Sequence, residues 1–346
     1  MGGSLVTSSA LRLLRAALCL AWLPGAAMAQ TAPWMTPDLL PAAKAEGSVT
    51  VYSSVNEAEG LPLWKIFEDA TGIKVSFVRA SDVQLNGRIA IEHRARQQSW
   101  DLTITTAVSQ LPPEVLAPYE PPEAASLDPS ARAKDRRWYA SSANYNTPAY
   151  NTKLVAAADL PTSFEDFATR AQWRGRVAID GTDIQWLSAM FQHYGEDKAR
   201  KLLRDLIGAT QPVIVDGHLA LARSLGAGEY LLALNNFTNL TYNVASSGAP
   251  TDIFALDPVA VFMVQVGVSS QAPHPNAARL AANFAISQEA QAFGANFGRL
   301  PVRADVTPNP PDALTRLKGR TIVPVVFGPE DERKWKRQFD ELFRPR

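Results

Sequence analysis

A strand, a helix and a second strand follow one another within about thirty residues near the start of this 346-residue chain. From Ser48, the segment SVTVYSS places apolar residues at alternate positions and is rich in β-branched residues, as half-buried strands are. Leu63, Phe67 and Ala70 then recur at helical spacing, and the run stops at Gly72. The segment IKVSFVRA resumes the strand pattern. Such a βαβ unit requires parallel strands, and it therefore predicts an α/β fold.

The same alternation of strands and helices recurs along the rest of the chain. WDLTITTA predicts a third strand, and GRVAID, QPVIVD and EYLLALNN predict further strands with helical segments between them. DPVAVFMVQVGV returns to a strand pattern late in the chain. Two α/β blocks without a Gly/Ser-rich linker predict two lobes joined by crossing strands. The charged tail predicts an amphipathic helix that packs through Trp335, Phe339, Leu342 and Phe343.

The first residues predict export. Arg12 and Arg15 precede an apolar run that is too short to span a bilayer and that ends in Ala27, Met28 and Ala29. A basic start, a short apolar run and a small-residue end are typical of a secretory signal peptide, here residues 1–29. We therefore expect cleavage after residue 29 and a mature protein in the periplasm.

Composition excludes several kinds of site. Cys19 is the only cysteine, and it lies inside the predicted signal, so the mature chain has no disulfide, zinc thiolate or thiol nucleophile. The 34 basic and 34 acidic residues balance, so no basic field for nucleic acid is expected. The rest of the chain has no apolar run long enough to cross a membrane, and we expect a soluble, exported product.

Several segments resemble a known family. YSSVNEAE, PTSFEDFATRAQWRGRVAI, AGEYLLALNN, QAPHPNAARLAANFAISQEAQAF and GRLPVRADV are similar to segments of the periplasmic solute-binding proteins of ABC importers. The subgroup is the one that includes the ferric-iron-binding proteins, and the resemblance spans Ser48 to Val306. It implies an α/β, two-lobed periplasmic binding protein fold (type II) with hinge strands that cross between the lobes. It also implies a small-molecule ligand held in the cleft, and delivery of that ligand to an ABC permease in the inner membrane.

The resemblance and the element pattern together predict the limits of the parts. We expect a signal peptide at 1–29, an N-terminal leader at 30–47, a first lobe from 48–140 with 258–305, and a second lobe, with the C-terminal helix, from 141–257 with 306–346.

The resemblance also locates the positions at which the iron-binding relatives hold their metal. Their two adjacent tyrosines match Phe237 and Thr238, their histidine matches Asn56, and their carboxylate matches Thr106. Amide and threonine side chains stay neutral at pH 7 and do not offset the charge of ferric iron. We therefore expect iron binding to be lost, with Tyr242 and Tyr230 as the nearby replacements.

Neutral polar side chains at strand ends remain as candidate ligand contacts. In the first lobe, such residues lie where a strand turns into a helix, a place that favours an anion. The segment DGTDIQW repeats this arrangement in the second lobe, with Gly181 allowing close approach of the backbone. Helix capping explains any single one of them equally well. The expected contacts are Ser53, Ser54, Asn56, Thr105, Thr106, Gly181, Thr182, Asp183, Asn236, Phe237 and Thr238.

Other side chains near these positions leave the charge of the ligand open. Trp186 suits either ligand stacking or core packing, and core packing is the favoured interpretation. Arg79 suits a carboxylate, a phosphate or an ordinary surface ion pair. A cationic ligand remains open because several acidic residues also lie at strand ends, namely Asp180, Asp183, Asp216 and Asp257.

No enzyme signature is present in the sequence. His93, His193, His218 and His274 are scattered without paired zinc spacing, and neither a nucleophile elbow nor a phosphate-cradling loop occurs in the required context. The expected protein is a monomer without a metal or cofactor that captures a small polar or anionic organic solute. The alternatives are a ferric-iron-binding protein with a non-standard ligand set and an exported enzyme on the same two-lobed fold.

Overall fold

The computed structural model describes residues 1, 32–327 and 330–344. Residues Pro33–Arg346 form one compact unit, and the sheet, the helices and the cavity all belong to it. Apart from Met1, the predicted signal peptide lies outside the described residues, so its cleavage stays a prediction.

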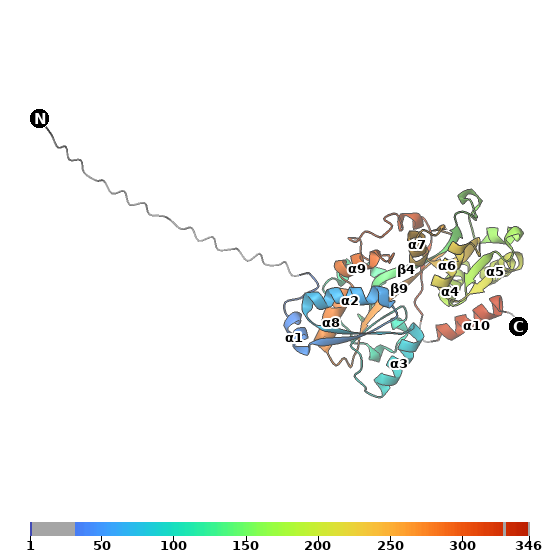
Figure 1. The fold of residues 1–346 in the computed structure, drawn as a ribbon. Helices are drawn as coiled ribbons and strands as arrows, with labels where there is room; N and C mark the ends of the chain where they lie inside the picture. The colour runs from blue at the N-terminus through green and yellow to red at the C-terminus, as the bar shows by residue number, and fades with distance from the viewer. Residues whose placement is uncertain (2–31, 328–329, 345–346) are drawn as a thin grey trace. The chain divides into compact units, whose positions relative to one another are not determined.

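A single ten-stranded sheet runs through the described residues (Figure 1). Its strand order is β2-β1-β3-β9-β4-β7-β5-β6, with β10 paired to β9 and β8 paired to β4. The strands are β1 (Ser48–Ser53), β2 (Lys74–Arg79), β3 (Leu102–Thr105), β4 (Tyr139–Asn151), β5 (Val177–Asp180), β6 (Val213–Val215), β7 (Leu232–Phe237), β8 (Thr251–Ile253), β9 (Val259–Val268) and β10 (Ile322–Pro324).

The pairing divides this sheet into two similar halves. In one half, β1 pairs in parallel with β2 and β3, as the βαβ pattern predicts. In the other half, β5 pairs in parallel with β6 and β7. Between them the long strands β9 and β4 pair antiparallel with each other and with their neighbours on either side. This arrangement confirms the expected two-lobed α/β fold with crossing strands.

Helices cover both halves of the sheet. In Figure 1, α2, α3 and α8 lie around the β1 half and α4, α5 and α6 around the β5 half. The helices are α1 (Leu39–Glu46), α2 (Glu57–Thr71), α3 (Asp82–Arg94), α4 (Ile184–Tyr194), α5 (Glu196–Thr210), α6 (His218–Ala227), α7 (Thr238–Ser246), α8 (Pro275–Ala285), α9 (Gln288–Ala295) and α10 (Asp331–Phe343).

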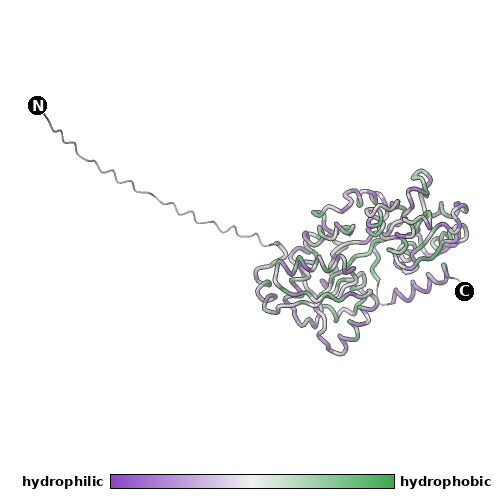
Figure 2. Tube along the Cα trace, in the orientation of Figure 1, coloured by the Kyte–Doolittle hydropathy of each residue, from purple (hydrophilic) through white to green (hydrophobic). Residues whose placement is uncertain are grey.

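The C-terminal helix α10 is amphipathic, as expected. Most of its length is coloured as hydrophilic in Figure 2, while Trp335, Phe339 and Leu342 are buried in the same core as β5 and α4. The indole ring of Trp335 packs edge-on against Phe191 of α4, with ring centroids 5.2 Å apart. The apolar stripe of α10 therefore fastens the end of the chain to the β5 half of the molecule.

Three elements differ from the sequence pattern. Residues 39–46, inside the expected leader, form α1, which packs against α8. The polar segment from Tyr139 to Asn151 forms the long central strand β4, and its register shifts between Thr147 and Ala149, on either side of a proline. A proline cannot donate to a sheet ladder, and an irregularity at that point accommodates it. Finally, β7 ends at Phe237 and α7 begins at the next residue.

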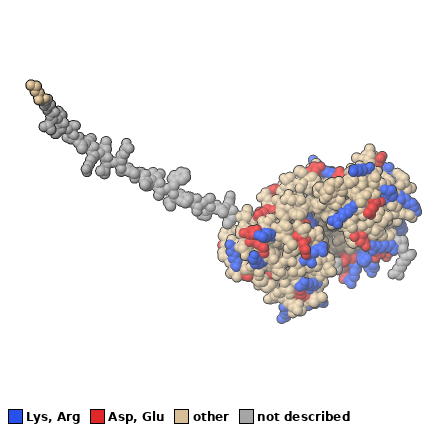
Figure 3. All heavy atoms as spheres, in the orientation of Figure 1, with Lys and Arg blue, Asp and Glu red and all other residues tan. Residues whose placement is uncertain are grey.

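Charged side chains of both signs are interspersed over the face seen in Figure 3. Among the described residues, no helix is both long and apolar enough to cross a membrane.

Candidate ligand-binding site

A cavity of about 440 Å³ opens where strand ends and helix starts from both halves of the sheet meet. One wall comes from the turn after β1, the start of α3 and the turn after β3. The facing wall comes from the starts of α4, α6 and α7, and β4 and β9 contribute Asn144 and Val264 between the two walls. A cavity at the carboxyl ends of parallel strands is the expected place for a ligand in an α/β sheet.

Six of the predicted contacts line this cavity together. They are Ser54, Asn56, Thr106, Thr182, Asp183 and Phe237. The placement brings together residues from both walls, although they are up to 183 positions apart in the chain. Asn56 precedes α2 without capping it through its side chain, so its amide is available to the cavity. Asn56 therefore does not cap α2 through its side chain, as an ordinary N-cap residue would.

Four other predicted contacts are buried behind the cavity wall. The hydroxyl of Ser53 donates to the carbonyl oxygen of Ile104 at 3.2 Å, and Thr105 accepts from a backbone N–H of its own turn. Asn236 and Thr238 are also fully buried, and both are hydrogen-bonded to protein groups. These side chains hold the turns in shape and do not line the cavity.

Gly181 also lies away from the cavity, and the reason for a glycine there differs from the one expected. A Cβ atom at this position would come within 2.5 Å of both Asp216 Oδ1 and Ile214 Cγ2. Gly181 is therefore needed because the neighbouring strand β6 and the residue after it, Asp216, leave no room for a side chain. A ligand is not what approaches the backbone there.

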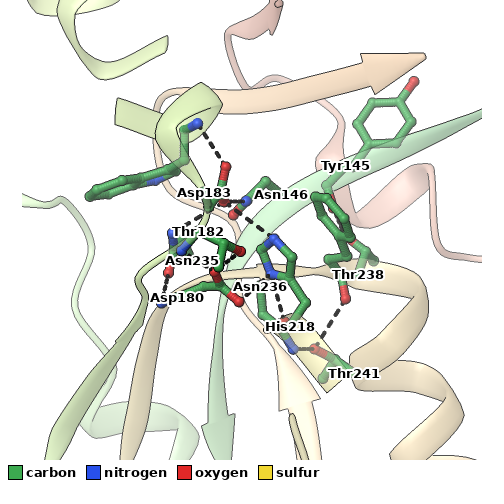
Figure 4. A network of polar contacts seen from close by, with 12 residues as sticks. Tyr145, Asn146, Asp180, Thr182, Asp183, His218, Asn235, Asn236, Thr238 and Thr241 are labelled. Atoms are coloured by element: carbon green, nitrogen blue, oxygen red, sulfur yellow. Dashed lines mark hydrogen bonds and ion pairs between the residues drawn. The ribbon is translucent and has the colours of Figure 1, made fainter. Parts of the chain in front are cut away.

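Asp183 is the centre of a buried polar network in the α4 wall (Figure 4). Its Oδ1 accepts from the backbone N–H of Trp186 at 2.9 Å and so caps α4. Its Oδ2 accepts from the amides of Asn146 and Asn235. Burial raises the pKa of Asp183 to about 6, although the nearby His218 lowers it. Asp183 is thus both a cap and a cavity carboxylate.

His218 belongs to the site, although it carries no paired-histidine motif in the sequence. It opens α6, and its Nδ1 lies 3.1 Å from Asn236 Oδ1 and 3.6 Å from Asp180 Oδ2. Its Nε2 lies 3.7 Å from Asp183 Oδ2. Both ring nitrogens therefore face oxygen acceptors. The segment VIVDGH repeats the strand, Asp and Gly order of VAIDGTD, and this repeat is the sequence signal that could have found it.

Arg299 is a second cavity residue that the strand-end reasoning missed. Its guanidinium group binds the carboxylate of Glu59 through Nε and Nη2, each at 2.9 Å, and donates from Nη1 to Asn144 Oδ1 at 3.0 Å. Both side chains of the ion pair are 13% exposed. Glu59 lies in the first turn of α2 and Asn144 lies in β4, so Arg299 links one wall of the cavity to the crossing strands.

Three of the four positions that match iron ligands in the resembling family line this cavity. These are Asn56, Thr106 and Phe237, whereas the Thr238 hydroxyl turns away and donates to the carbonyl oxygen of Tyr145 at 2.8 Å. The possible replacements, Tyr242 and Tyr230, do not line the cavity and pack against separate apolar clusters. In the described part of the chain, no group of three or more His, Cys, Asp or Glu side chains is placed to hold a metal.

The other residues considered as ligand contacts do not line the cavity. Trp186 is buried and packs edge-on against Phe164, which confirms core packing. Arg79 is exposed at the end of β2 and does not line the cavity. Asp216 forms an ion pair with the Arg344 side chain at 2.9 Å, and Asp257 lies 3.6 Å from the Arg320 guanidinium. Neither aspartate contributes to the cavity wall.

The fold and the cavity define a two-lobed solute-binding protein. Residues 113–322, more than half of the chain, match the family described as bacterial extracellular solute-binding protein. The chain belongs to this family, so it is a solute-binding protein. Members of the family are extracellular or periplasmic and are binding proteins rather than enzymes.

Solved structures show the same fold at low sequence identity. Iron-bound HitA from Pseudomonas aeruginosa is 22% identical, with 84% of this chain and 99% of that chain covered and a TM-score of 0.70. The substrate-binding protein of an ABC transporter from Agrobacterium tumefaciens is 17% identical, with 86% and 95% covered and a TM-score of 0.72. AfuA from Actinobacillus pleuropneumoniae, with exogenous fructose-6-phosphate bound, is 16% identical, with 87% and 99% covered and a TM-score of 0.69.

Proposed function

We propose that this protein captures a small polar organic solute between its two lobes and delivers it, as a monomer, to an ABC permease in the inner membrane. The observation that carries the proposal is the cavity wall. Uncharged hydroxyl and amide side chains reach the cavity from both sides of the β4–β9 pair, including Asn56 and Thr106 on one side and Thr182 and Asn239 on the other. Such groups bind a polar solute by hydrogen bonds without requiring a metal.

The lobes in this proposal are residues 48–140 with 258–305 and residues 141–257 with 306–346. A solute that contacts both walls binds the closed form more tightly than the open form, and it shifts the population by that difference in affinity. The strands β4 and β9 connect the two walls and are the natural hinge. Solute capture then needs no covalent chemistry, and we propose that the solute leaves unchanged.

The cavity also indicates which kind of hydrogen-bonding group the solute carries. Asp82 lines it, and its Oδ1 is buried without a hydrogen-bond partner among the described residues. The other oxygen of Asp82 accepts from the hydroxyl of Thr106. A buried acceptor without a donor is costly, so we expect the solute to present a hydroxyl or amine group to Asp82.

Ferric iron is the less supported ligand. The iron-bound neighbour shows that the fold can hold iron, but the matching positions here carry neutral side chains, and the nearby tyrosines lie in other clusters. The neighbour that holds fructose-6-phosphate shows that the same fold accommodates a small organic solute. We also propose export by a signal peptide at residues 1–29.

Native mass spectrometry of protein prepared from the periplasm tests the proposal. We expect a small organic molecule that leaves on mild heating and that rebinds when added back. At a hundredfold excess over its dissociation constant it should stabilise the protein by about 2.7 kcal/mol. Conversion of that molecule by the protein would instead indicate an enzyme. Rebinding that is unaffected by Asn56→Ala and Thr182→Ala together would place the site elsewhere.

A further inference from the structure

Two side chains that line the cavity have hydrogen-bond acceptors without donors. Asn239, in the first turn of α7, is only 5% exposed, and its Oδ1 is buried without a hydrogen-bond partner among the described residues. Asp82, the first residue of α3, has an Oδ1 atom in the same condition. Proteins rarely leave such atoms unpaired, because the lost hydration is costly. A bound solute that donates a hydrogen bond to each atom removes this cost.

The two acceptors lie on facing walls of the cavity. Asp82 belongs to the wall on the β1 side, where the hydroxyl of Thr106 donates to its other oxygen. Asn239 belongs to the facing wall, at the start of α7. A solute with a donor for each of them contacts both lobes at once, as closure around a ligand requires.

The basic side chains of the cavity are already balanced by protein carboxylates. Arg299 binds the carboxylate of Glu59 through Nε and Nη2. The ring of His218 lies 3.6 Å from Asp180 Oδ2 and 3.7 Å from Asp183 Oδ2 (Figure 4). No lysine is among the described residues that line the cavity. An anionic solute would therefore meet no unbalanced positive side chain there.

Two acidic side chains of the cavity, in contrast, have no positive partner. Asp82 and Glu332 both line it, and neither forms an ion pair within the described part of the chain. Glu332 comes from the first turn of α10, the helix that packs on the β5 half. Ionised carboxylates in a cavity attract a cation and repel an anion. The charge of the wall and its unpaired acceptors thus favour the same kind of solute.

We propose that the captured solute is a cationic amine, with its ammonium group at Asp82 and a second hydrogen-bond donor, an amine or a hydroxyl, at Asn239. An ammonium group carries three N–H donors and a positive charge, so it supplies both the missing donor and the missing charge at Asp82. Glu332 adds to the negative potential that attracts it. The inference rests on the proposed function, because it names the class of solute for the same cavity.

Linear compounds of three to six carbons are the probes for this inference. Diamines and amino alcohols carry the proposed groups, diols of the same length lack the charge, and dicarboxylates reverse it. We expect at least one diamine or amino alcohol to raise the melting temperature of the parent protein and to bind in calorimetry. The matching diol should bind at least about tenfold more weakly, because a neutral donor binds a carboxylate less strongly than a charged one. The matching dicarboxylate should not bind.

Removal of one charge tests the ammonium end. Asp82→Asn should weaken amine binding by about tenfold or more, because it removes the carboxylate that balances the ammonium group. Glu57→Gln is the matched control, since it also removes a carboxylate from the first turn of a helix but does not line the cavity. It should bind the amine as the parent does. Melting temperatures without ligand show whether either variant has lost stability through its helix start alone.

Addition of one charge tests the second donor. Asn239→Asp should strengthen diamine binding by about tenfold, because it places a carboxylate where the second amine donates. Gln185→Glu adds a carboxylate in the first turn of another cavity helix, α4, where no donor of the solute is assigned. We expect it to strengthen binding by less than about threefold, through general attraction only.

Four results would overturn the inference: no binding of any amine by the parent, equal binding of a diol and its matching amine, equal binding by Asp82→Asn and Glu57→Gln, or weaker diamine binding by Asn239→Asp. An equal gain in Asn239→Asp and Gln185→Glu would remove Asn239 from the site of the second donor. If the solute recovered from the periplasm carried no amine and rebound to the parent, the amine class would be wrong while solute capture would stand. A parent protein that bound none of the probes and carried no periplasmic solute would count against both proposals.

Discussion

The imidazole ring of His218 stacks on the phenyl ring of Phe237, with ring centroids 3.7 Å apart and planes inclined by 21°. Phe237 is the position that matches the first of the paired tyrosines in the resembling iron-binding proteins. At this position the chain therefore presents an apolar ring held against an imidazole, where those relatives present a phenolate oxygen. The stacked pair forms a firm surface in the cavity wall, because Phe237 also packs against Phe262 of β9.

The first prediction concerns iron. Adding ferric citrate should produce no visible charge-transfer absorption, because Phe237 has no oxygen and the hydroxyl of Thr238 points toward the backbone of Tyr145. Visible absorption spectroscopy of the purified protein is the measurement. A new band that disappears in Tyr242→Phe or Tyr230→Phe would contradict the prediction, and it would show that iron binds through other tyrosines.

The second prediction concerns the pH dependence of stability. Burial raises the pKa of Asp183 from 3.8 to about 6, so the folded protein holds this proton more tightly than the unfolded chain. The stabilisation is fully present below pH 3.8 and is lost as the pH rises toward 6. The full shift corresponds to about 3 kcal/mol, of which about 1 kcal/mol falls between pH 5 and pH 7.

Urea unfolding of Asp183→Asn at several pH values checks this prediction. The asparagine keeps an oxygen for the Trp186 N–H, and Asn146 has an unpartnered Oδ1 that can accept from the new amide. We expect the variant to lose the part of the pH dependence that Asp183 contributes. Asp69→Asn, at an exposed position of α2, is the control and should follow the parent. A variant profile parallel to that of the parent from pH 5 to pH 7 would contradict the assignment.

The third prediction concerns Gly181. An alanine there would collide with Asp216 and Ile214, so we expect Gly181→Ala to lower the free energy of unfolding by about 1 to 3 kcal/mol. Because Gly181 does not line the cavity, solute affinity should stay the same. Gly208→Ala, in the open interior of α5, is the control and should stabilise by about 0.4 to 1 kcal/mol. If Gly181→Ala lowered solute affinity without lowering the free energy of unfolding, Gly181 would belong to the binding site after all.

Elements whose patterns are local could be predicted from the sequence. The unit β1-α2-β2 depends on alternation, on helical spacing and on Gly72, which ends α2 in a left-handed conformation with φ of 77°. Strand β4 could not be predicted in this way. Its amide and hydroxyl side chains and Pro148 are unusual for a central strand, and its conformation is fixed by pairing with β9 and β7.

The same difference between local patterns and tertiary contacts applies to the residues of the site. Ser54 and Asn56 line the cavity as predicted from their place where a strand turns into a helix, and Thr106 as predicted from its match to a ligand position of the resembling iron-binding proteins. Arg299 lies in a loop after α9, and only tertiary packing against α2 and β4 brings it to the cavity. Asn236, a predicted contact, is buried behind the wall instead. Adjacent strand residues point to opposite faces, so the side that faces the cavity depends on where β7 ends.

The fourth prediction concerns the Arg299–Glu59 ion pair. Both side chains are largely buried, so Arg299→Gln leaves the carboxylate of Glu59 without its partner, and we expect a loss of about 3 kcal/mol in the free energy of unfolding. The double change Glu59→Gln and Arg299→Gln should restore most of this loss, because two neutral amides leave no unpaired charge. Arg333→Gln breaks the exposed pair with Glu330, whose side chains are 74% and 83% exposed, and should cost less than about 1 kcal/mol. Urea unfolding of the three variants at neutral pH is the measurement. A double variant no more stable than Arg299→Gln would show that packing of the arginine, and not its charge, holds this side of the cavity.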